Sequence, residues 1–454
     1  VRNVSAGRYH SCAILEDKSV RCWGANSYKQ LGYGDTEPRG TSLATLPRHL
    51  PALQFPIDGP PTVIMAASAH TCSLINGTVV LCWGSRGYFG FNSTHDHVTS
   101  LTTGGSASCA VFQSGKAWCW GSATYWDVGP NPPELQFAGS SSTIPPAVID
   151  DIPRPNGWSV TGMSVGGKHA CAIINGTAVS CWGYGLAYRL GTGSSTKIPE
   201  MSSTIALPDV PLTVETGGSI SCVILVTGDA YCCGAHSQGE TGYASNSASI
   251  GGSVSWAVDM GPLQMPGGAA VVSISAGEDH ACAVLVTGDL VCWGSNALGQ
   301  LGFANPEPVG PARYMTILEA GAVPMPGGRA VSSVSARGEH TCVRLADGGA
   351  VCFGRGNEGQ LGWGSEWTPS VVQLPVPVPV LPTPPPSTTP TAAASPSKAA
   401  TASPTAAVSI SPGSSPSTTA TAAVTSSVGA SPTSTSSPAA AAGPEEDPLP
   451  SPSL

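Results

Sequence analysis

The sequence has few charged residues and no long apolar run, and each shortage excludes a class of protein. Only 10% of its 454 residues are charged, and its 19 Lys and Arg residues form no basic cluster within a net charge of −9. A nucleic-acid backbone attracts a basic stripe, so we expect no nucleic-acid partner. A membrane-spanning helix needs roughly 18 consecutive apolar residues, so we expect no membrane span in this chain.

The sequence also lacks the motifs of common enzymes. It contains no Gly-rich phosphate loop and no nucleophile elbow, and the acidic residues Asp150, Asp151, Glu278 and Asp279 form no recognisable acid/base pair. We therefore expect no enzymatic activity and no cofactor. The opening residues, VRNVSAG, include no initiator Met and no signal-peptide segments, so the evidence for secretion must come from other residues.

Glycine, proline and cysteine are abundant instead, with 56, 42 and 15 residues. Fourteen of the cysteines form seven pairs whose members stand ten positions apart, and Cys233 is left over. The pairs are Cys12 with Cys22, Cys72 with Cys82, Cys109 with Cys119, Cys171 with Cys181, Cys222 with Cys232, Cys282 with Cys292, and Cys342 with Cys352. One spacing repeated seven times indicates a chain built from seven repeats.

The repeats share more than the cysteines. A Gly commonly stands five positions before the first Cys of a pair, at Gly7, Gly104, Gly166, Gly217 and Gly277. Trp-Gly follows the second Cys in five repeats, at Trp23, Trp83, Trp120, Trp182 and Trp293. A Gly-Gln-Leu-Gly turn comes next and is clearest at residues 299–302 and 359–362.

The residues between paired cysteines predict a β-hairpin. Segments such as CSLINGTVVLC and CAVLVTGDLVC place β-branched and apolar residues on both sides of a Gly-containing turn. In a hairpin centred on the middle residue the two cysteines lie opposite each other, with Cα atoms about 4.5 to 5.5 Å apart, within disulfide range. We predict one disulfide per hairpin. The alternative is free thiols that serve as small core residues.

Such disulfides would stiffen single hairpins without tying one repeat to the next. Each closes a loop of about ten residues, worth roughly 2 to 3 kcal/mol in the chain-entropy model. Closure of a ring therefore needs other contacts. We expect the chain to enter in the second strand of its unit, at VRNVSAG, and residues 368–374, TPSVVQL, to supply the missing first strand. Sharing one blade between the two ends would leave no open sheet edge.

The repeated order G-x-x-H-[ST]-C-A-L, turn, V-x-C-W-G-x-N-x-x-G-Q-L-G resembles the repeat of the regulator of chromosome condensation (RCC1) superfamily over about residues 1–375. The resemblance implies an all-β fold, a seven-bladed β-propeller of four-stranded blades closed by N- and C-terminal strands. We expect residues 1–375 to form this domain. The cysteine pairs depart from the intracellular members and are similar to those of secreted or ectodomain relatives.

The function that gives the superfamily its name is guanine-nucleotide exchange on the small GTPase Ran. The exchange residues of that family lie on one propeller face, outside the repeat motif, and none of them can be matched here. The chain also lacks the basic arm expected of a nuclear exchange factor. Because a fold does not carry a function, exchange on a small GTPase stays an alternative.

Three sets of residues invite functional readings that a structural role explains better. The sequence H-x-C recurs at His10, His70, His169, His280 and His340, but it lacks the knuckle spacing of a zinc site and a bridged Cys offers no thiolate. We therefore expect packing or backbone hydrogen bonds from these histidines, and no metal site. The Trp-Gly pairs are expected in the blade core. Cys233, in a Trp position, is expected to be an unpaired, buried small residue, the alternative being an intermolecular bridge.

Four N-x-[ST] sequons predict N-glycosylation, at Asn3, Asn76, Asn92 and Asn175. Asn76 and Asn175 belong to INGT turns at hairpin tips, where a glycan would disturb no packing. Together with seven candidate disulfides, the sequons favour an oxidising secretory route and an extracellular, cell-surface or cell-wall location.

Residues 376–454 differ in composition from the repeats. They consist mainly of Pro, Ser, Thr and Ala, with Lys398 and a small acidic cluster at residues 445–447. We expect a disordered, extended tail, either glycosylated like a mucin stalk or a hydroxyproline-rich wall protein, or a plain spacer.

These observations predict a non-enzymatic, monomeric binding or scaffold glycoprotein that presents propeller loops to an unidentified protein or glycan partner. The long connections between repeats, around residues 33–61, 122–160, 243–270 and 303–330, are the expected contact surfaces, because loops can vary where blade cores cannot. The alternatives are an intracellular regulator of a small GTPase and a secreted inhibitor that covers an enzyme's active site with one propeller face.

Overall fold

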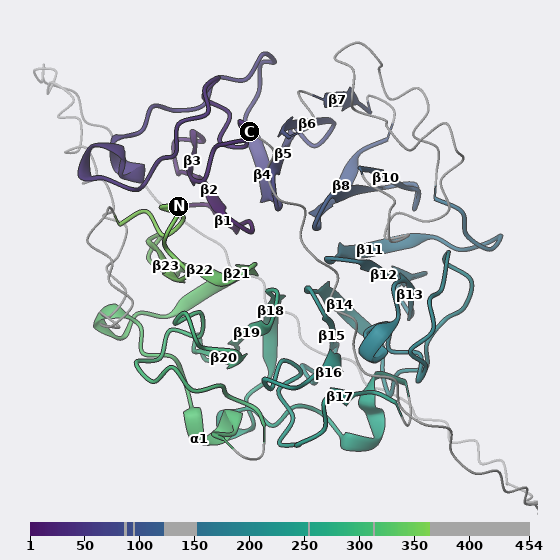
Figure 1. The fold of residues 1–454 in the computed structure, drawn as a ribbon. Coiled ribbons are helices and arrows are strands. Elements are labelled where there is room, and N and C mark those ends of the chain that lie inside the picture. Colours follow the sequence, from purple (N-terminus) through teal and green to yellow (C-terminus); the bar gives the residue numbers. More distant parts are fainter. Residues whose placement is uncertain (86–88, 94–95, 122–151, 253–254, 312–313, 364–454) are drawn as a thin grey trace, which may run out of the picture. The chain divides into compact units, whose positions relative to one another are not determined.

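A computed structural model describes residues 1–363, except for 86–88, 94–95, 122–151, 253–254 and 312–313. Within these residues, seven small antiparallel sheets stand around an axis as the blades of a β-propeller (Figure 1). The predicted fold class is confirmed. Contacts between Cα atoms divide the chain into two units, Val1–Pro384 and Pro385–Leu454, and the described residues all belong to the first. The domain boundary near residue 375 lies outside the described residues and stays a prediction.

Each blade runs outward from the axis through three consecutive strands. The inner strands are β1 (Asn3–Ala6), β4 (Pro61–Ala66), β8 (Val98–Thr103), β11 (Val160–Val165), β14 (Pro211–Thr216), β18 (Val271–Ala276) and β21 (Val331–Arg337). The second strands are β2 (His10–Ile14), β5 (His70–Ile75), β9 (Ala107–Phe112), β12 (His169–Ile174), β15 (Ile220–Leu225), β19 (His280–Leu285) and β22 (His340–Leu345). The third strands are β3 (Val20–Gly24), β6 (Val79–Gly84), β10 (Ala117–Gly121), β13 (Ala178–Gly183), β16 (Ala230–Ala235), β20 (Leu290–Gly294) and β23 (Ala350–Gly354). We number the blades 1 to 7 in this order.

The fourth, outermost strand varies among the blades. It is present in blade 2 as β7 (Phe89–Asn92) and in blade 5 as β17 (Ser249–Ile250). Single bridges stand in its place elsewhere, pairing Gly24 with Arg39, Gly183 with Ile198, and Gly294 with Val309. Residues 122–151, which follow blade 3, and the residues from 364 onward, which come after the turn that follows blade 7, lie outside the described ranges. Proline, which cannot donate to a strand ladder, is frequent in these connections and shortens the outer edge.

Short helices lie in the connections between blades. They are η1 (Leu43–Thr45), η2 (Pro47–His49), η4 (Leu186–Tyr188), η5 (Ser255–Met260), α1 (Ile317–Ala320), η6 (Pro266–Gly268) and η7 (Pro326–Gly328). None of the helices among the described residues has the length and apolarity needed to cross a membrane.

The hairpins form where the sequence predicts them. Asn76 and Gly77 both have positive φ angles, 53° and 74°, and Asn175 and Gly176 repeat this pair at 53° and 69°. Two consecutive positive φ angles define the tight turn whose twist matches that of the flanking strands, and Asn-Gly adopts it most readily. The turn sets the register, so that Cys72 lies directly opposite Cys82.

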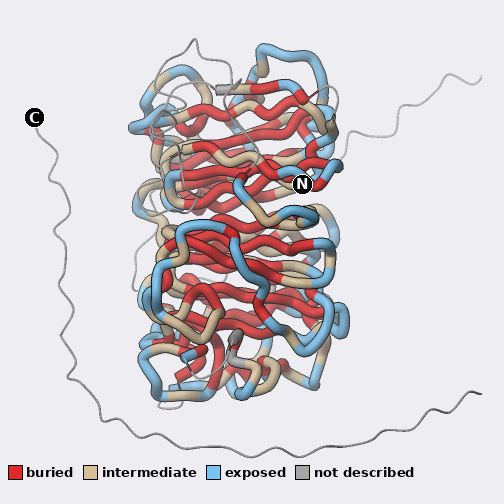
Figure 2. Tube along the Cα trace, turned by 90° about the vertical axis from the view of Figure 1, so that its right-hand side faces the viewer, coloured by how far each residue is buried: buried red, intermediate tan, exposed pale blue. Residues whose placement is uncertain are grey.

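The apolar core lies within and between neighbouring blades. Strands are buried along most of their length, and exposed residues gather in the turns (Figure 2). One cluster joins the two ends of the repeat array, because Val4, Ala6 and Trp23 of blade 1 pack with Cys342 and Leu361 from blade 7 and the turn after it.

Blades 1 and 7 meet and close the ring. The Ala6 N–H donates to the Ser335 hydroxyl at 2.9 Å, and the Ser5 hydroxyl accepts from the Ala66 N–H of blade 2 at 2.8 Å. The expectation that VRNVSAG is the second strand of its unit is wrong, because it forms the innermost strand of blade 1, and Arg39, further along the chain, bridges to the opposite edge of that blade. Residues 368–374, expected to complete the same blade, lie outside the described residues.

Candidate functional site

Each of the seven predicted cysteine pairs is bridged by a disulfide. The S–S distances run from 2.01 to 2.11 Å, and the paired Cα atoms are 4.0 to 4.1 Å apart. This Cα separation is somewhat shorter than the expected one, and each pair lies directly opposite across the second and third strands of its blade, as predicted. Cys12 and Cys22 have no exposed surface, and the other bridges are also buried except at Cys119 of blade 3, which is only partly buried.

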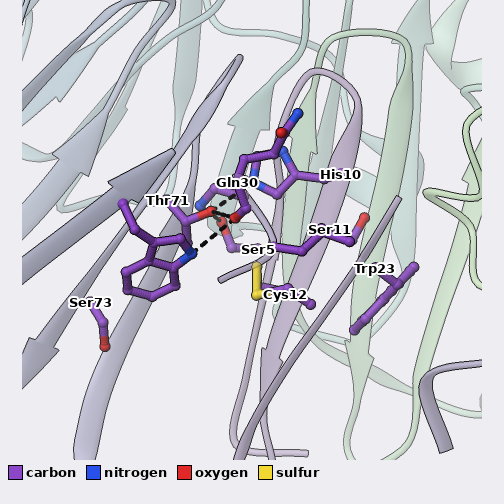
Figure 3. The surroundings of a disulfide bond; sticks show 12 residues. Ser5, His10, Ser11, Cys12, Trp23, Gln30, Thr71 and Ser73 are labelled. Carbon is purple, nitrogen blue, oxygen red and sulfur yellow. Dashed lines mark hydrogen bonds between the residues drawn. A yellow bond between two sulfur atoms is a disulfide. The ribbon is translucent and has the colours of Figure 1, made fainter. Parts of the chain in front are cut away.

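The histidines that precede the disulfides connect neighbouring blades. His10 Nε2 lies 2.8 Å from the Thr71 hydroxyl of blade 2, and that hydroxyl donates to the backbone carbonyl of Gln30 at 2.8 Å (Figure 3). Because a hydroxyl has one proton, it must accept from the imidazole, so Nε2 carries the hydrogen. The unit is a two-step relay of hydrogen bonds, from histidine to hydroxyl to carbonyl, across a blade boundary.

The histidine and the hydroxyl occur together at five of the seven boundaries. The pairs are His10 with Thr71, His70 with Ser108, His169 with Ser221, His280 with Thr341, and His340 with Ser11, at 2.7 to 2.9 Å. At the other two boundaries both partners are replaced. Ala107 and Ala170 occupy the two positions between blades 3 and 4, and Ile220 and Ala281 occupy them between blades 5 and 6. Because the histidine and the hydroxyl residue are replaced together, neither boundary is left with a buried polar side chain that lacks a partner.

Burial keeps these histidines neutral. Desolvation is the largest cause that lowers the pKa of His10, His169, His280 and His340 to about 3 from the ordinary 6.5. The glycine five positions before the first Cys makes room for the ring. A Cβ added at Gly277 would stand 2.3 Å from Cε1 of His280. The sequence prediction of packing or backbone hydrogen bonds missed the hydroxyl partner in the next blade.

The Gly-Gln-Leu-Gly turn, or its variant in blades 1 and 4, supplies the carbonyl at the end of four of the five relays, from Gln30, Arg189, Gln300 and Gln360. The Gln360 carbonyl accepts from the Ser11 hydroxyl at 2.9 Å and from the Trp23 indole N–H at 2.8 Å. The Gln30 carbonyl likewise accepts from Trp83 at 3.0 Å. The predicted core position of the repeat tryptophans is correct, and the indoles of Trp23, Trp83 and Trp293 also bond to the turn of the preceding blade.

Blade 5 lacks this tryptophan, and another part of the chain replaces it. Cys233 stands in the Trp position, buried, with its Sγ 3.8 Å from the Arg189 carbonyl, and burial raises the pKa of its thiol. Trp256, fully buried in η5, takes the vacant space. A Cβ added at Gly191 would meet the Trp256 ring at 2.8 Å, as one at Gly32 would meet the Trp83 ring. Cys233 is therefore unpaired and enclosed.

The four sequon asparagines occupy different environments. Asn76, Asn92 and Asn175 are exposed, the first and last at hairpin tips. Asn3 lies half-buried in the inner strand β1, and its side-chain oxygen is enclosed without a hydrogen-bond partner among the described residues. The structure therefore offers three accessible acceptors and one that is poorly accessible.

A small cavity lies on the axis at the end of the ring where the first and second strands of each blade are joined. All seven blades line it, through Arg8, Ser68, Gly105, Gly167, Gly217, Gly218, Ala276, Gly277, Glu278, Arg337 and Gly338. Burial raises the pKa of Glu215 to about 7 and that of Asp279 to about 6. Arg337 opposes the rise at Glu215, and burial lowers the pKa of Arg337 itself.

The remaining sequence candidates fall into two groups. Glu278 lines the axial cavity and Asp279 follows it in the chain, whereas Asp150 and Asp151 lie outside the described residues, as does most of the 122–160 connection. Among the side chains that the structure describes, no three of His, Cys, Asp and Glu are grouped as metal ligands would be. The connections at 33–61, 243–270 and 303–330 form much of the outer rim (Figure 1).

Comparison with known proteins identifies the repeat. The family model of the regulator of chromosome condensation (RCC1) repeat matches residues 1–30 and 271–300. The Ultraviolet-B receptor UVR8 of Arabidopsis thaliana is 26% identical over 381 residues, which cover 80% of this chain and 78% of the receptor.

Solved structures show the same fold. Prp20p of Saccharomyces cerevisiae, described for its binding to Gsp1p and histones, matches with a TM-score of 0.60 and 18% identity, over 79% of this chain and 83% of that one. Human WBSCR16 matches with a TM-score of 0.58 and 18% identity, over 76% and 85%. Repeat and fold agree: the chain contains RCC1 repeats and is similar to RCC1-family proteins, and it carries a disulfide in every blade.

Proposed function

We propose that this protein is a non-enzymatic glycoprotein of the extracellular space, cell surface or cell wall, which binds a protein or glycan partner through its propeller. One observation carries the proposal, namely a disulfide in each of seven blades, most of them buried. Disulfides persist in oxidising compartments and are rare in the cytosol. The exposed sequons at Asn76 and Asn175 support the same route.

A binding role follows from what the blades contain. The buried polar groups of the repeat, such as His10 and Thr71, are used in holding blades together and do not reach solvent. What varies between repeats is the connections and the exposed turns. A rigid ring with variable surface segments is the usual arrangement of a binding scaffold.

Alkylation of the cysteines in the native protein tests whether the protein resides in an oxidising compartment. The chain is isolated from its native source in the presence of a thiol-blocking reagent, unfolded, and analysed by mass spectrometry before and after reduction. We expect one cysteine, Cys233, to react after unfolding alone, and all fifteen to react after reduction. Fifteen reactive cysteines without reduction would contradict an oxidising location and, with it, the proposed extracellular role.

Nucleotide exchange on a small GTPase is a second candidate, favoured by the fold shared with Prp20p, whose published description includes binding to Gsp1p. A nucleotide-release assay with a purified small GTPase tests it directly. Acceleration of release by catalytic amounts of this chain would favour the second candidate over the first. A third candidate is a secreted enzyme inhibitor, and inhibition assays with the purified chain would test it.

A further inference from the structure

Blades 5 and 6 contain acidic residues but no basic ones. Residues 198–312, which contain both blades, include neither Lys nor Arg. The same segment holds ten acidic residues, Glu200, Asp209, Glu215, Asp229, Glu240, Asp259, Glu278, Asp279, Asp289 and Glu307. The two blades are neighbours in the ring (Figure 1), and contacts between β14 and β18 and between β15 and β18 join them. One sector of the propeller is therefore built entirely from acidic and uncharged residues.

Exposed aliphatic side chains gather on one face of this sector. Val226 and Val286 occupy the same position in their blades, directly after the second strand, and are 56% and 65% exposed. Leu212 and Val272, each the second residue of its inner strand, are 53% and 48% exposed. Val210 adds a smaller exposed area. All five lie at the end of the blades opposite the axial cavity, because the second strand of each blade separates the two ends.

Backbone contacts make these positions continuous across the two blades. The Val226 N–H donates to the Val210 carbonyl at 3.0 Å, and the Val271 N–H donates to the Gly228 carbonyl of blade 5 at 2.9 Å. The Val286 N–H donates to the Ala270 carbonyl at 2.9 Å. The hairpin turn of blade 5 therefore abuts the first residues of blade 6, and the aliphatic side chains form one surface.

Carboxylates border the aliphatic residues. Asp209 precedes Val210 in the chain, and Asp229 and Asp289 end the hairpin turns that Val226 and Val286 begin. All three are exposed, and their hydrogen bonds are local, to the Val210 N–H and to the Thr227 and Thr287 hydroxyls. No ion pair is found for them among the described residues. Their negative charge is therefore unneutralised by the protein itself.

The other described blades do not repeat this surface. At the position of Val226, blades 2 and 4 carry the sequon residues Asn76 and Asn175, and blade 3 carries Gln113. Glycans on Asn76 and Asn175 would cover this face in blades 2 and 4, of which blade 4 adjoins blade 5, whereas residues 198–312 of blades 5 and 6 contain no sequon. The aliphatic residues and the missing basic residues coincide in one sector, which favours a single binding surface.

We propose that this surface binds a protein segment that carries Lys or Arg beside aliphatic side chains. It is called the acidic aliphatic face and consists of Val210, Leu212, Val226, Val272, Val286, Asp209, Asp229 and Asp289. Aliphatic contacts supply most of the affinity of such an interface, and opposite charge at its rim selects the partner and speeds association. The proposal rests on the proposed binding function, to which it adds the surface and the chemistry of the partner.

The test uses the full secreted chain and a synthetic amphipathic peptide that presents Leu and Lys on opposite sides of a helix. Binding is measured by fluorescence anisotropy at low and high salt, with poly-lysine as a probe that has charge but no aliphatic groups. We expect V226S/V286S to weaken peptide binding about tenfold or more and to leave poly-lysine binding unchanged. We expect D229N/D289N to weaken peptide binding at low salt and to reduce its salt dependence.

Matched changes at equivalent positions provide the control. Q113S in blade 3 and A346S in blade 7 alter the residue that corresponds to Val226 and should change the peptide affinity less than about twofold. Equal affinity of the wild type and V226S/V286S would overturn the proposal. So would an absence of peptide binding combined with a self-association that V226S/V286S abolishes, since the occupant would then be a second copy of the chain. Neither outcome bears on the disulfide and alkylation result that tests the proposed extracellular role.

Discussion

Nε2 of His340 lies 2.9 Å from the hydroxyl of Ser11, and this contact bonds the last blade of the ring to the first across 329 positions of sequence. The same hydroxyl donates to the Gln360 carbonyl, which also accepts from Trp23. The disulfides, in contrast, each lie within one hairpin. Covalent bonds therefore stiffen the blades, while hydrogen bonds and packing between blades hold the ring closed.

Replacing Ser11 by Ala should destabilise the closed ring. The change leaves the buried His340 Nε2 hydrogen without an acceptor and costs about 1 to 3 kcal/mol in the free energy of unfolding. Chemical denaturation followed by tryptophan fluorescence measures the loss. Thr287→Ala, which removes an exposed hydroxyl bonded only to Asp289, should stay within about 0.5 kcal/mol. If both variants unfold like the wild type, the relay does not stabilise ring closure.

The protein should lose stability in mild acid. In the unfolded chain a histidine titrates near 6.5, and in the fold burial lowers the pKa of His10, His169, His280 and His340 to about 3. The unfolded chain therefore binds more protons between these values, so stability is complete above pH 6.5 and falls as the pH drops toward 3. From pH 7.5 to 5.0 the four histidines together lower the free energy of unfolding by ~8 kcal/mol.

Buried carboxyls oppose this trend without reversing it. The raised pKa values of Glu215, about 7, and Asp279, about 6, mean that the fold gains stability as these groups take up protons. Over the same interval they return about half of the loss or less, because only two such carboxyls act against four histidines. Denaturation midpoints at pH 7.5 and 5.0 check the sign, and equal midpoints would contradict it.

Replacing His280 by Ile should flatten this pH dependence. Blade 5 already uses Ile220 at the equivalent position, close to Gly217, so the side chain fits the site. Thr341 keeps its bond to the Gln300 carbonyl. Removing one buried histidine should reduce the slope of stability against pH by up to about 1.4 kcal/mol per pH unit between pH 6.5 and 3. A slope identical to that of the wild type would show that His280 takes up no proton on unfolding.

Glycan occupancy should depend on the exposure of the asparagine and not only on the presence of a sequon. Asn76→Gln and Asn175→Gln should each lower the mass of the protein, when it is expressed through a secretory pathway, by one glycan, because both asparagines lie at hairpin tips. Asn3→Gln should cause no such loss, since Asn3 is half-buried in β1. Electrophoresis before and after enzymatic deglycosylation measures each change. A glycan found on Asn3 would mean that modification precedes the folding of blade 1.

Most of the fold could be predicted from the sequence, because the strands and turns of each blade are set by residues that are close together in one repeat. Hairpin turns such as Asn76-Gly77 set the register, and the register places the paired cysteines opposite each other. The contacts between blades were harder to predict, since they join positions about 60 residues apart. A signal for them exists in the repeats. A histidine in one repeat is accompanied by Ser or Thr after the histidine position of the next, and the two exceptions lack both.

Other features lie beyond what the repeat pattern can predict. The outer strands are shorter than the family resemblance implies, because their partners come from connections of variable length and composition. The acidic aliphatic face depends on exposed residues of two blades, and no local pattern marks residues such as Val226 as exposed. The role of Trp256 is hidden for a similar reason, since it belongs to a connection and fills a space left by a substitution 23 positions earlier.

Trp256 and Cys233 provide a test of how the propeller tolerates a missing tryptophan. Trp256→Ala removes a fully buried indole beside Gly191 and should cost about 3 to 5 kcal/mol, while Met260→Ala, an exposed change in the same helix, should cost far less. Cys233→Trp alone places a second indole in an occupied space and should also destabilise the protein.

Combining the two changes should recover much of the loss, because Cys233→Trp restores the repeat residue whose indole can donate to the Arg189 carbonyl, as Trp23 donates to that of Gln360. Denaturation of the wild type, both single variants and the double variant forms a double-mutant cycle, with an expected coupling of about 2 kcal/mol or more in favour of the double variant. Losses that simply add would mean that Trp256 does not occupy the tryptophan site of blade 5. Recovery of stability in the double variant would show that the blade boundary requires an indole at this site, whichever segment of the chain supplies it.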